Sequence, residues 1–355
     1  MRIAQVAPLF ESVPPRRYGG TERVVSYLTE ELVRQGHRVT LFATGDSRTS
    51  AELVPILDRP LRGDPHWIMY AIIELERVVE RAADFDILHF HTDHLHYPLL
   101  RYLDVPVVTT LHGRLDIPGL ESLQRMFPDA AVVSISEAQR APLPDARWVG
   151  TVPHGLPSSL YRPGTGAGGY LAFVGRISPE KRLDRAVEIS RRTGLPLRIG
   201  AKVDPADRKY FEREIEPLLA TPGIHFLGEI DDRQKRELLG EASALLFPID
   251  WPEPFGLVMV EAMACGTPVI AFRGGSVEEV LRAGVTGAIV DTVDEAVAAL
   301  PAVLALDRAG CREEFERCFS ARRMARDYVR VYERLMDTSR RVPAPGWSAG
   351  AASNG

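Results

Sequence analysis

The sequence Trp251-Pro-Glu-Pro-Phe-Gly-Leu-Val-Met-Val-Glu-Ala-Met-Ala-Cys-Gly-Thr-Pro-Val-Ile-Ala271 combines a turn, a helix and a strand. The turn is rich in proline, the apolar run at 257–264 predicts a helix, and residues 268–272 predict a buried strand. Another short apolar run, residues 244–248, precedes the turn. A strand, a helix and a second strand in this order form the repeating unit of a parallel sheet covered by helices. We therefore expect an α/β fold.

The same alternation extends through the rest of the chain in two blocks. In the first block we expect helices at 21–34 and 67–81, and strands at 3–7, 37–43, 87–91, 105–111 and 131–135. In the second block we expect helices at 181–192, 205–220, 233–240, 257–264 and 277–282, and strands at 170–174, 196–200, 224–227, 244–248 and 268–272. A Gly-rich segment at 161–169 has the composition of a linker between them. The pattern predicts two Rossmann-like parallel-sheet domains that face an interdomain cleft.

The length of 355 residues also fits two domains, since one domain holds roughly 150 residues. We place the first domain at 1–163 and the second at 164–319. A helix at about 320–338 has apolar and aromatic residues near helical spacing, and we expect it to pack back on the first domain. Residues 339–355 are predicted to form a disordered tail, because the end of the chain is rich in Pro, Gly, Ala and Ser.

Composition excludes several classes of protein. A net charge of -5 argues against a nucleic-acid binder, which normally has a basic excess. Three cysteines without a CxxC pair argue against a disulfide scaffold and a zinc cluster. No apolar run approaches the ~20 residues of a membrane helix. We expect a cytoplasmic protein; peripheral contact with the inner membrane surface and the oligomeric state stay open.

Ligands of open α/β sheets bind beyond the carboxyl ends of the strands, so the strand-to-helix turns are the candidate sites. Gly19 and Gly20 follow the first strand and open a helix, which lets backbone N–H groups approach an anion; the alternative is a plain tight turn. Arg176 and Lys181 occupy the same place in the second block, and Lys181 is expected in the first turn of a helix. Two cations there suit a diphosphate, although a surface charge cluster with Glu180 is the alternative.

The turn quoted first contains two glutamates. Glu253 lies in the irregular turn, and the helix that follows offers the free N–H groups of three residues, Phe255, Gly256 and Leu257. Glu261 lies one turn further on, inside an otherwise apolar helix. A buried carboxylate is costly unless something donates hydrogen bonds to it, and sugar or ribose hydroxyls are suitable donors. A purely structural role for Glu261 is the alternative.

The segment Glu-Pro-Phe-Gly-Leu-Val-Met-Val-Glu at 253–261 resembles the Glu-x7-Glu motif of the family-4 retaining glycosyltransferases, which have the GT-B fold. The resemblance covers about residues 1–338. It includes Gly19-Gly20, the turn Val-Gly-Arg-Ile-Ser-Pro-Glu-Lys at 174–181, and the segment Gly-Gly-Ser-Val-Glu-Glu-Val at 274–280. The combination of these motifs in this order is highly specific.

The resemblance implies a role for each matching residue. Glu253 is expected to hold hydroxyls of the donor sugar, and Glu261 the ribose of the nucleotide. His112 is expected beside the sugar and the reaction centre, Glu22 on the acceptor side, and Ile230 near the base. The diphosphate is expected to bind the side chains of Arg176 and Lys181 and backbone N–H groups of Gly19, Gly20, Phe255, Gly256 and Leu257. The resemblance implies no metal and no cofactor; the residues expected to act in catalysis are His112, Glu253, Arg176 and Lys181.

A histidine-rich segment, residues 89–96, ends the strand at 87–91. His89 and His91 share one face of that strand, so they could bind zinc, line the acceptor site or be structural, and we assign His91 to the acceptor side. Two departures from the family pattern follow later in the chain. His154 stands where the family usually has Asn, and we assign it no role; Arg182 stands where Gly often follows the Lys.

We therefore expect a glycosyltransferase that moves a hexose from a nucleoside-diphosphate sugar to a hydroxyl acceptor, with retention of configuration and without a metal. The acceptor class (sugar, lipid-linked or natural product), the sugar and the base stay open. One alternative is a GT-B-fold sugar-nucleotide epimerase or phosphorylase, which would release an epimer or a sugar phosphate. The other is a non-catalytic nucleotide-sugar-binding protein, which would bind the donor without turnover.

Overall fold

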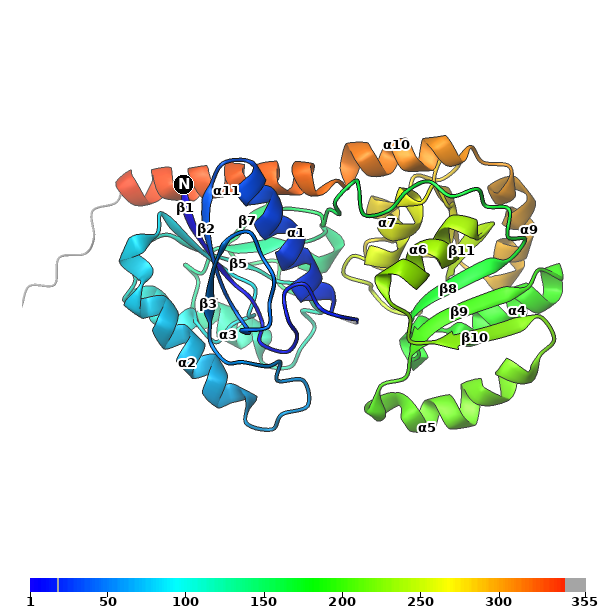
Figure 1. Cartoon of the computed structure of the whole chain (residues 1–355), viewed down its shortest axis with the longest axis horizontal. Helices are drawn as coiled ribbons and strands as arrows, with labels where there is room; N and C mark the ends of the chain where they lie inside the picture. The colour runs from blue at the N-terminus through cyan, green and yellow to red at the C-terminus, as the bar shows by residue number, and fades with distance from the viewer. Residues whose placement is uncertain (18, 342–355) are drawn as a thin grey trace, which may run out of the picture.

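The computed structural model of the chain describes residues 1–17 and 19–341, which form two parallel sheets with helices around them (Figure 1). The first sheet has seven strands in the order β3-β2-β1-β4-β5-β6-β7, and the second has six in the order β10-β9-β8-β11-β12-β13. The strands of the first sheet are β1 (Arg2–Val6), β2 (Arg38–Ala43), β3 (Glu52–Pro55), β4 (Ile87–Phe90), β5 (Val107–Thr110), β6 (Val132–Ser134) and β7 (Trp148–Thr151). Those of the second are β8 (Leu171–Arg176), β9 (Leu197–Lys202), β10 (Ile224–Gly228), β11 (Ala244–Phe247), β12 (Val269–Phe272) and β13 (Gly287–Val290). The predicted α/β fold with two parallel-sheet domains is confirmed.

Helices connect the strands and cover both sheets (Figure 1). The first sheet is accompanied by α1 (Gly20–Arg34), α2 (Trp67–Glu80) and α3 (Leu120–Met126). The second is accompanied by α4 (Leu183–Thr193), α5 (Arg208–Tyr210), α6 (Asp232–Glu241), α7 (Leu257–Ala264), α8 (Val277–Val280), α9 (Val293–Leu304) and α10 (Arg308–Cys318). Local sequence explains where two of these helices begin or end. Asp231 forms a capping box with Gln234 at the start of α6, and Gly194 ends α4 in the left-handed conformation.

Two predicted helices are wrong in detail. The helix predicted at 181–192 begins only at Leu183, because Pro179–Lys181 forms a short 3-10 turn and Arg182 has φ 50. Lys181 therefore precedes α4 instead of lying in its first turn. The helix predicted at 205–220 is a succession of short 3-10, α and π segments. Pro217 contributes to this break, since proline removes a backbone donor and crowds the preceding turn.

The last helix, α11 (Ala321–Arg341), lies along the first sheet although it follows the second domain in the sequence (Figure 1). It is strongly amphipathic, and its buried Tyr332 accepts a hydrogen bond from Gln5 Nε2 in β1 at 3.2 Å. The limits that we predicted at 163 and 319 stay predictions. The helix runs three residues into the tail predicted at 339–355, and residues 342–355 lie outside those that the structure describes.

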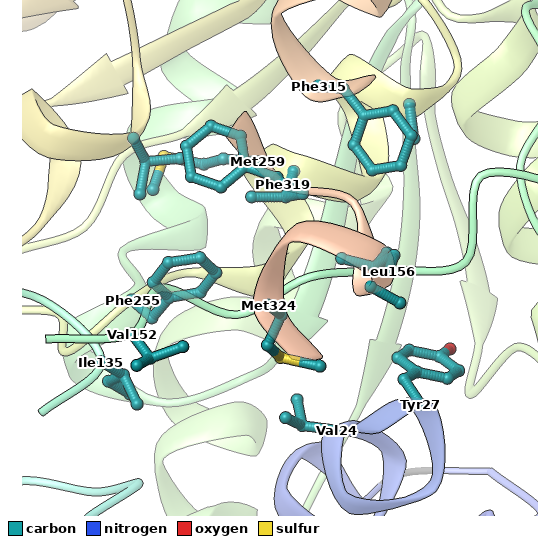
Figure 2. Close-up of a cluster of buried hydrophobic side chains, with 14 of the residues drawn as sticks. Val24, Tyr27, Ile135, Val152, Leu156, Phe255, Met259, Phe315, Phe319 and Met324 are labelled. Carbon is teal, nitrogen blue, oxygen red and sulfur yellow. The ribbon is translucent and has the colours of Figure 1, made fainter. Parts of the chain in front are cut away.

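One hydrophobic cluster joins the two domains (Figure 2). It combines buried side chains of α1, of the loops after β6 and β7, of the turn before α7, and of α10 and α11. The labelled members are Val24, Tyr27, Ile135, Val152, Leu156, Phe255, Met259, Phe315, Phe319 and Met324. Because this apolar surface is shared, separating the domains would expose it to water.

Within residues 1–17 and 19–341, no helix has the length and apolar character needed to cross a bilayer.

Candidate active site

A cleft of about 1040 Å³ lies between the two domains and receives residues from both. The strand-to-helix turns of the two sheets line it, as expected for parallel α/β sheets. All the residues that we predicted for the site line this cleft: Gly19, Gly20, Glu22, His91, His112, Arg176, Lys181, Ile230, Glu253, Phe255, Gly256, Leu257 and Glu261. The structure thus brings them together, while their individual roles stay predictions.

The turn before α7 meets the first domain directly. Gly256 has φ 77, a left-handed conformation that favours glycine, and the helix begins at Leu257. Ser136 Oγ of the first domain donates to the backbone oxygen of Pro254 at 2.7 Å. A Cβ placed on Gly20 would lie 3.8 Å from Leu257 Cδ1. The starts of α1 and α7 therefore face each other, and their free N–H groups form one region that favours anions.

Glu253 and Lys181 form an ion pair inside the cleft. Trp251 Nε1 also donates to Glu253 Oε2 at 3.1 Å, and Lys181 Nζ lies 4.8 Å from the centre of a Trp251 ring. Glu253 is only 8% exposed, so its carboxylate depends on these two partners. A phosphate that approached Lys181 and a hydroxyl that approached Glu253 would find charged groups already held in position.

Gly275 packs closely against the backbone of Glu253. It has φ +54, and a Cβ there would lie 2.2 Å from the backbone oxygen of Glu253. Gly194 offers a matched control, because its φ is +71 but a Cβ would have no heavy atom within 4 Å.

We expect Gly194→Ala to lower the free energy of unfolding by about 1 kcal/mol, the cost of a left-handed alanine. Gly275→Ala adds a backbone collision, so we expect a further loss of roughly 1–3 kcal/mol and a displaced Glu253. Urea unfolding of both variants measures the difference. Equal losses in the two variants would show that Gly275 does not support this loop.

Arg176 lies at the carboxyl end of β8 and also belongs to an acidic cluster. Its Nη2 is 2.5 Å from Glu180 Oε1, and its other guanidinium nitrogens lie 3.8 Å from Asp204 and 3.6 Å from Asp207. Arg176 and Glu180 therefore do form a charge cluster at this turn, which was the alternative to a diphosphate site. Lys181 does not belong to this cluster, because it pairs with Glu253. Arg176 also lines the cleft, so we expect an anion in the cleft to contact it.

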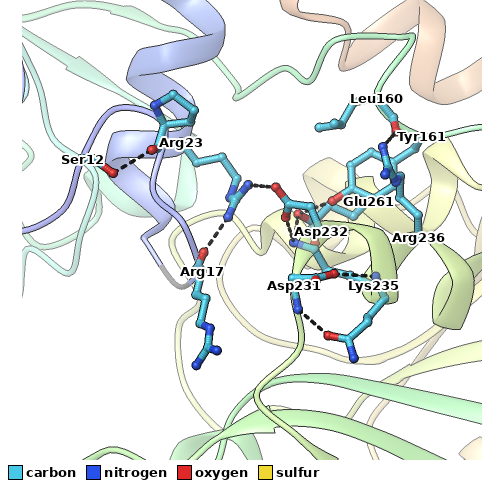
Figure 3. A network of polar contacts seen from close by, with 12 residues as sticks. Ser12, Arg17, Arg23, Leu160, Tyr161, Asp231, Asp232, Lys235, Arg236 and Glu261 are labelled. Carbon is cyan, nitrogen blue, oxygen red and sulfur yellow. Dashed lines mark hydrogen bonds and ion pairs between the residues drawn. The ribbon is translucent and has the colours of Figure 1, made fainter. Parts of the chain in front are cut away.

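Glu261 is held by two residues that the sequence analysis missed (Figure 3). Tyr161 Oη donates to Glu261 Oε1 at 2.9 Å, and Lys235 Nζ approaches the same oxygen at 2.5 Å. Lys235 also lines the cleft, one turn after the start of α6. The scarcity of lysine was a usable signal, because Lys235 is one of four lysines in the chain, as is Lys181.

An ion pair crosses the cleft beside Glu261 (Figure 3). Arg23 of α1 places Nη1 2.5 Å from Asp232 Oδ2 of α6, and its Nη2 donates to the backbone oxygen of Arg17 at 2.6 Å. Asp231 caps the start of α6, whereas Asp232 in its first turn also contacts the opposite domain.

Histidines of the first domain line the cleft where the reaction centre is predicted. His112 stacks on His154, with ring centroids 5.2 Å apart, and His154 in turn contacts Phe255 edge-on at 4.8 Å. His154, to which we assigned no role, therefore connects the first domain to the turn before α7. Burial lowers the pKa of His112 to about 3 and that of His154 well below its ordinary value, so both are neutral near pH 7.

A hydrogen-bond chain sets the tautomer of His112. His91 Nε2 donates to Gln5 Oε1 at 2.8 Å, so Nδ1 of neutral His91 must accept. It lies 2.8 Å from His112 Nε2, which therefore carries the proton. His112 Nδ1 is left as an acceptor with no hydrogen-bond partner in the described part of the chain. A hydroxyl in the cleft is a suitable donor for it.

The other members of the histidine-rich segment differ in position. His89 is fully buried and bonds Tyr332 Oη and Thr110 Oγ1, each at 2.7 Å, which is a structural role. His96 bonds Thr109 Oγ1 at 2.7 Å. Among residues 1–17 and 19–341, no group of three or more His, Cys, Asp and Glu is arranged to hold a metal ion.

Glu22 and Ile230 are the two predicted site residues not yet described. Burial raises the pKa of the Glu22 carboxyl. The side chain of Ile230 packs against Gly200.

Comparison with known proteins agrees with this geometry. The model of Glycosyltransferase Family 4 matches residues 18–155, and that of Glycosyl transferases group 1 matches residues 166–317. The phosphatidyl-myo-inositol mannosyltransferase of Mycolicibacterium smegmatis is 27% identical over 345 residues, covering 87% of each chain. The glycogen synthase of Mycobacterium tuberculosis is 28% identical over 353 residues, covering 81% of each chain.

Solved structures share the fold. The structure of Anabaena HepE in complex with UDP and glucose has a TM-score of 0.71 at 17% identity, covering 94% of this chain and 100% of HepE. At 17% sequence identity, this structural similarity shows only that the two proteins share a fold. Together, the two sheets, the motif-bearing turns around one cleft and the two family models show that the chain is a GT-B-fold glycosyltransferase that belongs to glycosyltransferase family 4.

Proposed function

We propose that this glycosyltransferase moves a sugar from a nucleoside-diphosphate sugar to a hydroxyl acceptor, with retention of configuration and without a metal. The observation that supports this most is the convergence of Arg176, Lys181, Glu253 and the start of α7 on one cleft. Cations and free N–H groups suit a diphosphate, and a carboxylate held beside them suits the hydroxyls of the attached sugar. HepE binds UDP and glucose, which belong to the classes of nucleoside diphosphate and sugar that we propose for the two parts of the donor.

In this proposal the protein stabilises the leaving group. The bond between the anomeric carbon and the diphosphate breaks, and charge develops on the departing oxygen. Arg176, Lys181 and the N–H groups at the start of α7 stabilise that charge without reorganising. The acceptor oxygen bonds to the same face of the sugar and its proton passes to the departing phosphate oxygen. Glu253 and His112 orient the sugar, and Glu261 with Lys235 meets the ribose.

Nucleoside diphosphates are expected to stabilise the protein. A ligand that binds only the folded state at about 100 times its Kd adds roughly 2.7 kcal/mol. Thermal unfolding with UDP, GDP and ADP, each in excess EDTA, measures the shift and identifies the base. Nucleoside monophosphates serve as controls, because they lack the second phosphate that Arg176 and Lys181 would bind. If no diphosphate raised Tm, the proposed donor site would be wrong.

The stereochemistry of transfer tests the rest of the proposal. Sugar diphosphates of the selected base are incubated in EDTA with a panel of sugar, lipid-linked and phenolic hydroxyl acceptors, and products are followed by proton NMR. A glycoside with the anomeric configuration of the donor supports the proposal, and an inverted glycoside contradicts it. With the donor alone, an epimer or, in the presence of phosphate, a sugar phosphate would show the epimerase or phosphorylase alternative.

A further inference from the structure

The first-domain wall of the cleft has an apolar surface that the donor does not explain. Phe10 and Trp67 are each 38% exposed and Leu95 is 40% exposed, although all three are large apolar side chains. All three line the cleft, and the rings of Phe10 and Trp67 lie 5.6 Å apart. Exposed apolar residues are ordinary when scattered, but a cluster inside a binding cleft indicates a ligand with apolar surface.

Glu74 is a carboxyl group within this apolar wall. Trp67, Ala71 and Glu74 are spaced i, i+4 and i+7 on α2, and all three line the cleft. Glu74 is 2% exposed, and its Oε1 has no hydrogen-bond partner in residues 1–17 and 19–341. Burial raises its pKa well above the ordinary value, and no cation in the part of the chain that the structure describes opposes that rise. A protonated carboxyl both donates and accepts a hydrogen bond, so it complements a hydroxyl.

Two further polar atoms on this wall lack partners. Thr92 Oγ1 and His94 Nδ1 are buried, line the cleft, and have no hydrogen-bond partner among the residues that the structure describes. Both follow β4, the parallel neighbour of β1, so they lie at the same carboxyl edge of the first sheet as the Gly19-Gly20 turn. Buried polar groups are normally satisfied, so an unsatisfied set in one wall indicates that a ligand completes it.

We propose that this wall is an acceptor subsite for a molecule with an aromatic or alkyl body and a hydroxyl group, in which Phe10, Trp67 and Leu95 contact the body and Glu74 bonds the hydroxyl. This inference rests on the proposed function and names the chemical class of its acceptor. Because Glu74 belongs to the first domain and the donor groups mostly to the second, binding of the two substrates is separable.

Small probes test the subsite directly. We expect the full-length protein to bind 4-phenyl-1-butanol at least tenfold more tightly than 1-butanol, as measured by calorimetry or ligand-observed NMR. We expect it to bind 4-phenylbutylamine less tightly than the alcohol, because a neutral carboxyl in apolar surroundings favours the hydroxyl. Equal or tighter binding of the amine would overturn the hydroxyl class, and equal binding of the two alcohols would overturn the apolar subsite.

Variants of Glu74 separate binding from folding. Glu74→Leu is expected to weaken 4-phenyl-1-butanol binding at least fivefold while raising Tm, since it removes an unsatisfied buried polar group. Glu74→Gln keeps a neutral hydrogen-bonding group and is expected to stay within threefold of the wild type. Glu76→Leu, at an exposed position of the same helix, is the control. Unchanged binding in Glu74→Leu would refute the role of Glu74.

The donor site provides the independent readout. Glu74→Leu is expected to keep the thermal shift produced by the selected nucleoside diphosphate. If the wild type bound the phenyl alcohol but no nucleoside diphosphate, the proposed donor would fail while the subsite stood. If it bound the nucleoside diphosphate but not the phenyl alcohol, the subsite would fail and the proposed function would stand.

Discussion

Replacing Lys181 with alanine is expected to lower the turnover number for sugar transfer by roughly 10²–10³-fold, the usual cost of removing one preorganised group from a developing charge. Lys181 forms an ion pair with Glu253 in the cleft and lies over the ring of Trp251. The substitution therefore removes the cation paired with Glu253, the carboxylate that we propose to bind the sugar, and leaves that carboxylate without its charged partner. Initial rates with the donor sugar whose diphosphate gives the largest thermal shift measure the effect.

Lys209→Ala is the matched control for this variant. Lys209 is exposed and does not line the cleft, so its removal changes the net charge equally without touching the site. We expect its rate to match that of the wild type. A rate for Lys181→Ala within threefold of Lys209→Ala would refute the role of Lys181 in stabilising the leaving group.

Glu253→Gln is expected to lower the transfer rate by roughly 10–10²-fold, since hydrogen bonds to a charged group contribute about 1.5–3 kcal/mol. The amide keeps the size of the side chain but removes the charge that Lys181 and Trp251 hold. If Glu253 binds the sugar, the affinity for the complete sugar nucleotide falls while that for the nucleoside diphosphate stays within about threefold. Calorimetric titration of both ligands measures this difference.

The control for Glu253→Gln is Glu237→Gln on α6, where Glu237 is exposed and pairs with Arg233 at 3.1 Å. This change should leave both affinities unaltered. An equal loss of affinity for the diphosphate and the sugar nucleotide in Glu253→Gln would mean that the carboxylate acts through Lys181 and the phosphates instead of the sugar.

Local sequence predicted the fold and the cleft because the deciding signals are short. The alternation of apolar strands and helices is visible within windows of 20 residues or so. The two turns with Gly20 and Gly256 open helices, and their place at strand ends puts them at one edge of each sheet. Every residue that we predicted for the site lines the cleft for this reason.

The residues that sequence analysis missed contact the site from far along the chain. Tyr161 lies 100 residues before Glu261, and Lys235 lies 26 residues before it. His154 departs from the family pattern, and its stacking on His112 depends on how the segment after β7 passes the cleft. No local pattern encodes such contacts, because they form only when distant segments pack together: α6 beside α7 within the second domain for Lys235, and the first domain against the turn before α7 for His154.

The chain passes between the two halves twice, and the two passages are fastened together. Leu156 N donates to Phe319 O and Ala321 N to Leu156 O, each at 2.8 Å, so the two crossing segments form a small parallel bridge. Sliding of one domain past the other would break these paired backbone hydrogen bonds, whereas a rotation centred on the bridge would keep them. We therefore expect any opening of the cleft to rotate about this bridge, and to separate Arg23 from Asp232, the ion pair that crosses the cleft.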